Sequence, residues 1–326
     1  MGNKRWQILP QAPNEYRRAC GVSPVMAQFL YNREVKSEEI ELFLAADRRL
    51  EGNPFLLPDM AQAVSRIYEA LLSGEKIGIH GDFDVDGITA TAILAEGLSW
   101  LGTKAIPYIP DRINEGHGLG LPAMEKLHEQ GVNLVITVDC GITDLAVAKQ
   151  TQEMGMDMII TDHHIPSAGL PQAIAVVNPK RKDSQYPCSD LAGVGTAFKL
   201  LQALLHKDNR EKRLTELLDL VALGTVADMV PLVGENRYLV KEGLKVLNNT
   251  HRIGLQEMIK LARLETGKLD AESVSWVLGP RLNAASRMGD ASSGYQLLTT
   301  HSPEEARTLA VWLEEKNAER QKVSNE

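Results

Sequence analysis

Residues 76–87 read Lys-Ile-Gly-Ile-His-Gly-Asp-Phe-Asp-Val-Asp-Gly, an apolar run that ends in a histidine and three alternating acids. Side chains two residues apart in an extended chain point to the same face. We therefore expect His80, Asp82 and Asp84 to converge where a buried strand ends, with a helix starting after Gly87. Imidazole and carboxylate groups together suit a divalent cation. Taken alone, an acidic turn with Asp86 as helix cap explains the stretch equally well.

Strands and helices alternate from this stretch onward. Uninterrupted apolar runs that predict strands lie at residues 76–80, 104–109, 133–138, 156–161 and 173–177. Helical periodicity lies between them, at residues 88–101, 121–129 and 142–154. Apolar strands joined by helices are typical of a parallel sheet covered on both faces. The pattern predicts an α/β fold with a doubly wound, mainly parallel sheet and helices on both faces.

The remainder of the chain is expected to be helical. After Pro187, helical periodicity is found at residues 191–205, 210–223, 238–247 and 255–264. Residues 279–289 begin with Gly-Pro and are predicted to form a loop with two arginines. The predicted organisation is a helical lead-in over residues 1–58, a catalytic domain over 59–302, and the start of a long linker helix over 303–326.

Composition limits the class of protein. The chain has 326 residues, 44% of them hydrophobic, and a formal net charge of -8. That charge argues mildly against a nucleic-acid partner, although acidic metal ligands add to it and bound cations reverse its local sign. Three widely spaced cysteines indicate a reducing compartment. No apolar stretch approaches membrane-spanning length, so we expect a cytoplasmic protein.

Acidic residues and histidines are also expected directly after later strands, as they are after the first. Asp139 follows the strand at 133–138, Asp162-His163-His164 follow the strand at 156–161, and Asp228 follows an apolar run. Gathered at one sheet edge, these groups would repel one another without a compensating cation. Carboxylates and imidazoles without thiolates favour Mn²⁺ or Mg²⁺ over structural zinc. The set is large for one ion, so it predicts two bridged ions and hydrolysis of a phosphoester or phosphoanhydride.

Residues 80–87, 138–141, 161–164 and 224–228 together resemble the four motifs of the DHH phosphoesterase superfamily. Within it the chain is most similar to RecJ-type exonucleases, through residues 191–195, 228–232 and 279–285. The resemblance covers nearly the whole chain and implies a 5′→3′ exonuclease on single-stranded DNA that releases mononucleotides in repair and recombination. Such proteins continue into a DHHA1-type domain and an OB-type domain, and neither is expected within these residues.

The resemblance also implies roles for individual residues. His80, Asp82 and Asp139 would hold one ion, and Asp84, Asp139, His163 and Asp228 the other, with Asp139 bridging. Asp86 would cap the following helix. His164, Asp139 and Asp84 would be catalytic, with His164 facing the scissile phosphate or the leaving oxygen. Asp162 could fix the tautomer of a neighbouring histidine.

Residues for substrate contact are expected outside the four motifs. Arg281, Asn283 and Arg112 are predicted to bind phosphate, since a guanidinium fork matches its oxygens. His117 and His128 are interpreted as surface or packing histidines. The implied cofactors are two divalent cations, Mn²⁺ preferred or Mg²⁺, and the implied partner is single-stranded DNA. Helicases and single-strand-binding proteins are candidate protein partners, and no membrane is expected.

Two other functions stay open. One is a phosphodiesterase of the same superfamily that acts on short oligonucleotides or cyclic dinucleotides, which the segment at 279–285 argues against. The other is a non-catalytic replication scaffold that kept the fold and lost ligands. Every predicted ligand position is occupied by a suitable residue, which favours catalysis.

Overall fold

The computed structural model describes residues 7–325, which belong to two compact units. The first unit ends at Glu51 and is helical. Its elements are α1 (Asn14–Ala19), α2 (Pro24–Tyr31), η1 (Ser37–Glu39), α3 (Ile40–Ala45) and η2 (Arg48–Leu50). Buried side chains of Cys20, Ala27, Leu30, Val35 and Ile40 form a small core within this unit. The unit therefore has apolar packing of its own.

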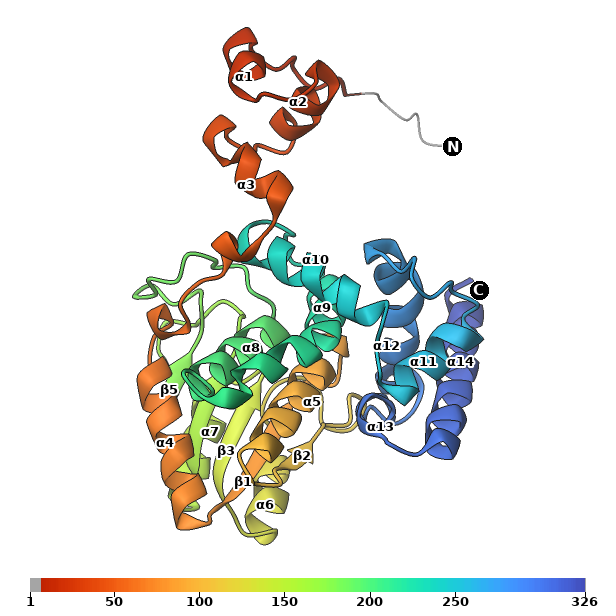
Figure 1. Ribbon diagram of the computed structural model, residues 1–326. Coiled ribbons are helices and arrows are strands. Elements are labelled where there is room, and N and C mark those ends of the chain that lie inside the picture. The colour runs from red at the N-terminus through yellow and green to blue at the C-terminus, as the bar shows by residue number, and fades with distance from the viewer. Residues whose placement is uncertain (1–6, 326) are drawn as a thin grey trace. The chain divides into compact units, whose positions relative to one another are not determined.

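The second unit, from Gly52 onward, is built on a five-stranded parallel sheet (Figure 1). The strands are β1 (Lys76–Gly81), β2 (Ile106–Tyr108), β3 (Val132–Val138), β4 (Asp157–Thr161) and β5 (Ala175–Val177). Their order is β2-β1-β3-β4-β5, and every neighbouring pair is parallel. The order reverses between β1 and β3, as in other doubly wound sheets. The predicted fold class is confirmed.

Both faces of the sheet are covered because its strands are apolar on both sides. Alternate residues such as Ile79, Ile136 and Ile159 pack with α4 (Met60–Ser73), α5 (Val85–Trp100) and α8 (Gly193–Leu204). The residues between them, including Val135 and Ile160, join a second core with α6 (Leu121–Glu129) and α7 (Leu145–Glu153). Strands buried in this way need no polar face, which explains their uninterrupted apolar sequences.

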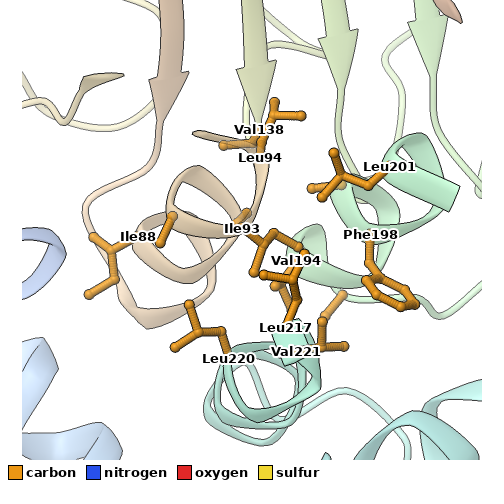
Figure 2. Close-up of a cluster of buried hydrophobic side chains, with 14 of the residues drawn as sticks. Ile88, Ile93, Leu94, Val138, Val194, Phe198, Leu201, Leu217, Leu220 and Val221 are labelled. Carbon is orange, nitrogen blue, oxygen red and sulfur yellow. The ribbon is translucent and has the colours of Figure 1, made fainter. Parts of the chain in front are cut away.

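Helix α5 is buried on nearly every side, because it packs between the sheet and the later helices. Figure 2 shows Ile88, Ile93 and Leu94 of α5 beside Val194, Phe198 and Leu201 of α8 and Leu220 and Val221 of α9 (Leu218–Ala227). Burying each such side chain contributes about 1.5–3 kcal/mol. The helix α5 starts at Val85, within the acidic stretch and not after Gly87 as expected. This packing holds its start against the start of α8 and the end of α9.

The remaining elements cover the edge of this core. They are η3 (Pro54–Leu56), η4 (Asn209–Leu217), α10 (Gly234–Leu247), α11 (Ile253–Leu261), η5 (Ser273–Leu278), α12 (Gly279–Met288), α13 (Ser292–Thr299) and α14 (Pro303–Asn325). The predicted single helix over residues 210–223 is divided into a 3-10 helix and α9. Among the described residues, no helix is both long enough and apolar enough to span a bilayer.

The loop predicted over residues 279–289 is wrong, because α12 is helical from Gly279 to Met288. It follows directly on η5, a π-helical turn. The helical backbone is continuous from Ala271 through η5 into α12, so Pro280 lies inside a helical run. The π-helical turn directly before Pro280 is the local irregularity that accommodates a residue without an N–H.

Candidate metal centre

The acidic stretch lies at the point where the strand order reverses. The register pairs His80 with Thr137 and Gly81 with Val138, and it pairs Val138 with Thr161 on the other side. The residues that follow these three strand ends therefore emerge side by side. Ligands of doubly wound sheets bind at this carboxyl edge.

Three overlapping groups of side chains at this edge have ligand atoms within 4.8 Å of one another and could each hold a metal ion. The groups are Asp82, Asp84 and Asp139; Asp86, His163 and Asp228; and Asp139, His163 and His164. Asp139 and His163 each belong to two groups, so the three form one continuous centre. A carboxylate shared between neighbouring groups is the arrangement that two adjacent ions require.

The closest approach joins Nε2 of His163 and Oδ1 of Asp139, two ligand atoms that have no hydrogen bond. Nε2 of His163 lies 3.0 Å from Oδ1 of Asp139, 3.7 Å from Oδ2 of Asp228 and 3.8 Å from Oδ2 of Asp86. Neither His163 Nε2, Asp139 Oδ1 nor Asp82 Oδ1 has a hydrogen-bond partner among the described residues, although all are buried. Buried polar atoms are costly without a partner. The donor set therefore fits a bound cation, which would satisfy these atoms together.

Burial and mutual repulsion shift the pKa values of this centre. Burial, with the neighbouring Asp84, raises the pKa of Asp82 to about 6, and burial with Asp84 raises the pKa of Asp228 to about 6. Burial and the surrounding acids raise the pKa of Asp139 well above its usual value. Burial lowers the pKa of His163 to about 4. All four shifts disfavour charge in the absence of a cation. A bound cation would oppose the shifts of the three carboxylates, and the neutral imidazole of His163 is the form that ligates a metal.

Asp139 is held from two sides. Its backbone has a φ of +63°, rare for a residue with a side chain, and its N–H donates to the Thr161 carbonyl at 3.0 Å. A Cβ added at Gly193, the first residue of α8, would lie 2.5 Å from Oδ1 of Asp139. Only glycine lets the helix start approach the carboxylate this closely.

Asp86 does not cap its own helix, so the predicted role is wrong. Asp84 is the N-cap of α5 and accepts the N–H of Gly87 at 3.1 Å. Asp86 is buried and instead accepts the N–H groups of Gly193 at 2.6 Å and Val194 at 2.8 Å. Its carboxyl group thus lies at the N-terminus of α8, where a helix dipole favours an anion, whereas burial and the neighbouring Asp228 and Asp84 raise its pKa well above the usual value. Asp86 links the first motif to α8 and also lies among the candidate ligands.

Comparison with known proteins identifies the family. A model described as "DHH family, N-terminal domain" matches residues 76–225. A crystal structure of exonuclease RecJ bound to manganese is 38% identical, covers 82% of this chain and 68% of that chain, and has a TM-score of 0.73. The chain belongs to the RecJ family.

Other RecJ proteins match almost the whole of this chain. RecJ of Bacillus subtilis (strain 168), a single-stranded-DNA-specific exonuclease, is 41% identical over 98% of this chain and 40% of its own length. The structure of RecJ from Thermus thermophilus in complex with Mn²⁺ is 34% identical, with a TM-score of 0.82, over 98% of this chain and 46% of that one. The chain spans about half the length of the curated relatives it matches.

His80 is the one predicted ligand that lies outside the candidate groups of this RecJ-family chain. Strand β1 ends at Gly81, so the alternation that would align His80 with Asp82 stops between them. The His80 ring stacks on Tyr108 with centroids 5.5 Å apart, and Nδ1 lies 3.5 Å from Sγ of the buried Cys140. Burial lowers its pKa to about 4. Its Nε2 is buried without a hydrogen-bond partner among the described residues, so a ligand role for His80 stays a prediction.

Asp162 and His164 form a hydrogen-bonded pair beside the ligands. Nδ1 of His164 lies 2.8 Å from Oδ1 of the buried Asp162, which also accepts the backbone N–H groups of His163 and His164. This bond with Asp162 raises the pKa of His164. The bond occupies Nδ1, and the side chain of His164 is 56% exposed. The predicted tautomer-fixing contact is therefore present in the structure.

Two predicted phosphate contacts have partners within the protein. Arg281 pairs with Glu314 of α14, at 2.5 Å from Nε and 3.1 Å from an Nη, and also donates to the Val277 carbonyl. Oδ1 of Asn283 accepts the N–H of Val85 at 3.2 Å, at the start of α5. These contacts hold α12 against α14 and the first motif. Sequence could not show this, because these partners are identified only once the helices have packed together.

The other basic residues lie nearer the acidic stretch. The guanidinium of Arg112 lies 4.9 Å from the centre of the Phe83 ring. Partial burial and the charges of Arg112 and Arg320 lower the pKa of Arg287, while Asp84 opposes the shift. The charges of two other arginines and of a candidate ligand therefore act on Arg287. The sequence leaves Arg287 open between a phosphate contact and an exposed arginine and gives no signal for Arg320, because their common surroundings arise only from tertiary packing.

Proposed function

We propose that this chain is the catalytic part of a 5′→3′ exonuclease that hydrolyses single-stranded DNA and releases 5′-mononucleotides. The observation that carries the proposal is the set of clustered carboxylates and imidazoles at the strand-order reversal of a RecJ-family chain. A non-catalytic scaffold would not need to keep buried, unpaired ligands, because their desolvation is unfavourable without a cation.

The ligand geometry supports two cation sites that share Asp139. Asp82, Asp84 and Asp139 would hold one cation, and Asp139, His163 and Asp228 the other. Mn²⁺ suits this mixture of oxygen and imidazole ligands better than Mg²⁺ does. Such a pair of ions supplies Lewis-acid stabilisation of a phosphoryl group and makes an attacking water more acidic.

His164 would act on the leaving group. Its Nδ1 is occupied by Asp162, so Nε2 is the nitrogen available to a substrate. The raised pKa keeps more of the imidazole protonated near neutral pH. A protonated Nε2 can donate a hydrogen bond to a phosphate oxygen and deliver its proton to the departing 3′ oxygen. Asp162 holds the ring in place through this transfer.

Arg112 and Arg287 would position the DNA phosphates. Arg287 loses part of its solvation and is repelled by Arg112 and Arg320. A phosphate between these guanidinium groups would relieve the repulsion and accept bidentate hydrogen bonds. This local excess of positive charge lies beside an acidic cluster in a chain with a net charge of -8, so substrate contact requires the cations as well.

The test is Mn²⁺-dependent digestion of 5′-labelled single strands, duplexes, dinucleotides and cyclic dinucleotides by the wild-type chain and by Asp139→Asn. We expect mononucleotides from single strands only, and no product from Asp139→Asn. Cleavage of dinucleotides or cyclic dinucleotides alone would support the other phosphodiesterase function. Mn²⁺ binding with no hydrolysis of any substrate would overturn the proposal.

The cellular setting is part of the same proposal. RecJ-type activity is consistent with a cytoplasmic enzyme of DNA repair and recombination that meets helicases or single-strand-binding proteins. The functional division into residues 1–58, 59–302 and 303–326 also stays a prediction. Localising a tagged chain in cells would test the cytoplasmic location. Measuring survival after DNA damage would test the role in DNA repair.

A further inference from the structure

The loop between β2 and α6 covers the residue that separates two candidate ligands. Phe83 lies between Asp82 and Asp84 and is only 1% exposed. The Arg112 guanidinium lies 4.9 Å from its ring centre, and the His117 ring lies 4.3 Å away by centroids. The loop is therefore fixed onto the first motif by two of its side chains.

Hydrogen bonds anchor this loop before and after His117. Glu115 accepts the N–H of Asp111 at 3.0 Å and the hydroxyl of Tyr108 at 2.6 Å. The N–H of Leu119 donates to Oδ2 of Asp144 at 2.9 Å. Gly116 and Gly118, on either side of His117, have φ of +78° and +81°, a conformation that other residues rarely adopt. The loop conformation therefore determines the position of His117.

His117 faces the centre. Its Nδ1 lies 3.6 Å from Oδ2 of Asp82, which is beyond hydrogen-bond distance. Two donors that each lie about 2.1 Å from the same ion are roughly 3–4 Å apart. Oδ1 of Asp82 is buried without a hydrogen-bond partner among the described residues. The His117 side chain is 68% exposed, so its ring has room to turn toward an ion.

We propose that His117 is an additional nitrogen ligand of the cation held by Asp82, Asp84 and Asp139. The inference rests on the metal centre of the proposed function and adds a residue from outside the four motifs. It replaces the interpretation of His117 as a surface or packing histidine. Without His117, Asp82, Asp84 and Asp139 offer this cation only oxygen atoms, which suit Mg²⁺ as well as Mn²⁺. With His117, Mn²⁺ is preferred at this position.

The experiment compares His117→Ala with His128→Ala, which removes an exposed histidine from the neighbouring helix α6. Binding of Mn²⁺ alone and of Mg²⁺ alone is measured by isothermal titration calorimetry, and nitrogen coupling to bound Mn²⁺ by pulsed EPR. We expect His117→Ala to weaken Mn²⁺ at one site by about 10- to 100-fold, to weaken Mg²⁺ much less, and to lose one nitrogen coupling. His128→Ala should match the wild type in all three measurements.

Three outcomes distinguish failure of the His117 proposal from failure of the proposed metal centre. Unchanged Mn²⁺ binding by His117→Ala would overturn the proposal. Equal weakening of Mn²⁺ and Mg²⁺ with unchanged nitrogen coupling would also overturn it, because His117 would then act only by orienting Asp82. A wild-type chain that binds neither ion would instead overturn the metal centre of the proposed function. Thermal unfolding without metal checks that the variants are folded.

Discussion

Replacing Gly193 with alanine would place a methyl group inside the proposed metal centre. The added Cβ would lie 2.5 Å from both Cβ and Oδ1 of Asp139, whereas ordinary contact begins at 3.4 Å. Either the carboxylate or the start of α8 must therefore retreat by about 0.9 Å. A displacement of about 1 Å can cost roughly 100-fold in rate, so we expect kcat/KM to fall by about that factor. Overpacking should also lower the free energy of unfolding by about 1–3 kcal/mol.

Gly195→Ala is the matched control, because it makes the same change two residues later in the same helix. An added Cβ there would meet the side chain of Leu191 at 3.4 Å, which is ordinary contact. Alanine replaces glycine in a helix with a gain of up to about 1 kcal/mol. We therefore expect Gly195→Ala to keep wild-type activity and to be as stable as the wild type or more so.

Three measurements test the comparison: Mn²⁺-dependent release of nucleotides, Mn²⁺ affinity by calorimetry, and urea unfolding without metal. The expected result is weaker Mn²⁺ binding and slower hydrolysis for Gly193→Ala alone. Wild-type activity and affinity in Gly193→Ala would refute the claim that α8 confines Asp139. Equal losses in both variants would show that helix α8 as a whole is sensitive, and would refute the specific contact.

Three further predictions concern protons and substrate. Asp162→Asn replaces the carboxylate that raises the pKa of His164 with a neutral amide, so kcat should fall by about 100-fold and the limb of the pH profile that reports loss of the imidazolium proton should move to lower pH. An unmoved limb would exclude His164 as the proton donor. Mn²⁺ affinity should fall as pH drops through 6, because protons then compete at Asp82 and Asp228, whose pKa values are about 6 without metal. Calorimetry in buffers of different ionisation enthalpy measures the released protons, and a constant affinity from about pH 5 to pH 8 would contradict the assignment. Finally, Arg281→Ala should lower stability by about 1–3 kcal/mol, through loss of the Glu314 pair, with KM unchanged, whereas Arg287→Ala should raise the KM for DNA. The reverse pattern in urea unfolding and steady-state kinetics would restore Arg281 as a phosphate contact.

Local patterns predicted most of the fold and the main part of the site. Short apolar runs predicted the strands, because a strand buried on both faces has no polar positions. The acids and histidines after those runs were expected at one edge, and Asp82, Asp139 and His163 do lie in overlapping groups there. The parallel sheet makes this possible, since it brings the ends of separate strands to a common edge.

Errors arose where a local signal had a distant partner. Asp86 has the spacing of a helix cap, but it accepts N–H groups from Gly193 and Val194, more than a hundred residues away. Arg281 has the chemistry of a phosphate contact and pairs with Glu314 in this structure, so its substrate role stays a prediction. Both partners come from distant segments of the chain, which a local pattern does not reveal.

The sequence by itself determined the fold class, the family resemblance and the chemical type of the centre, because periodicity and ligand identity are properties of short segments. Only the tertiary structure decided which contacts these residues make. The His80 ring packs against Tyr108 and Cys140, outside the three candidate groups, and the start of α8 confines Asp139 and engages Asp86. The loop that carries His117 lies over Phe83 and thereby brings an unassigned imidazole to Asp82. Such contacts depend on the packing of whole helices and loops, so no single stretch of the sequence can encode them.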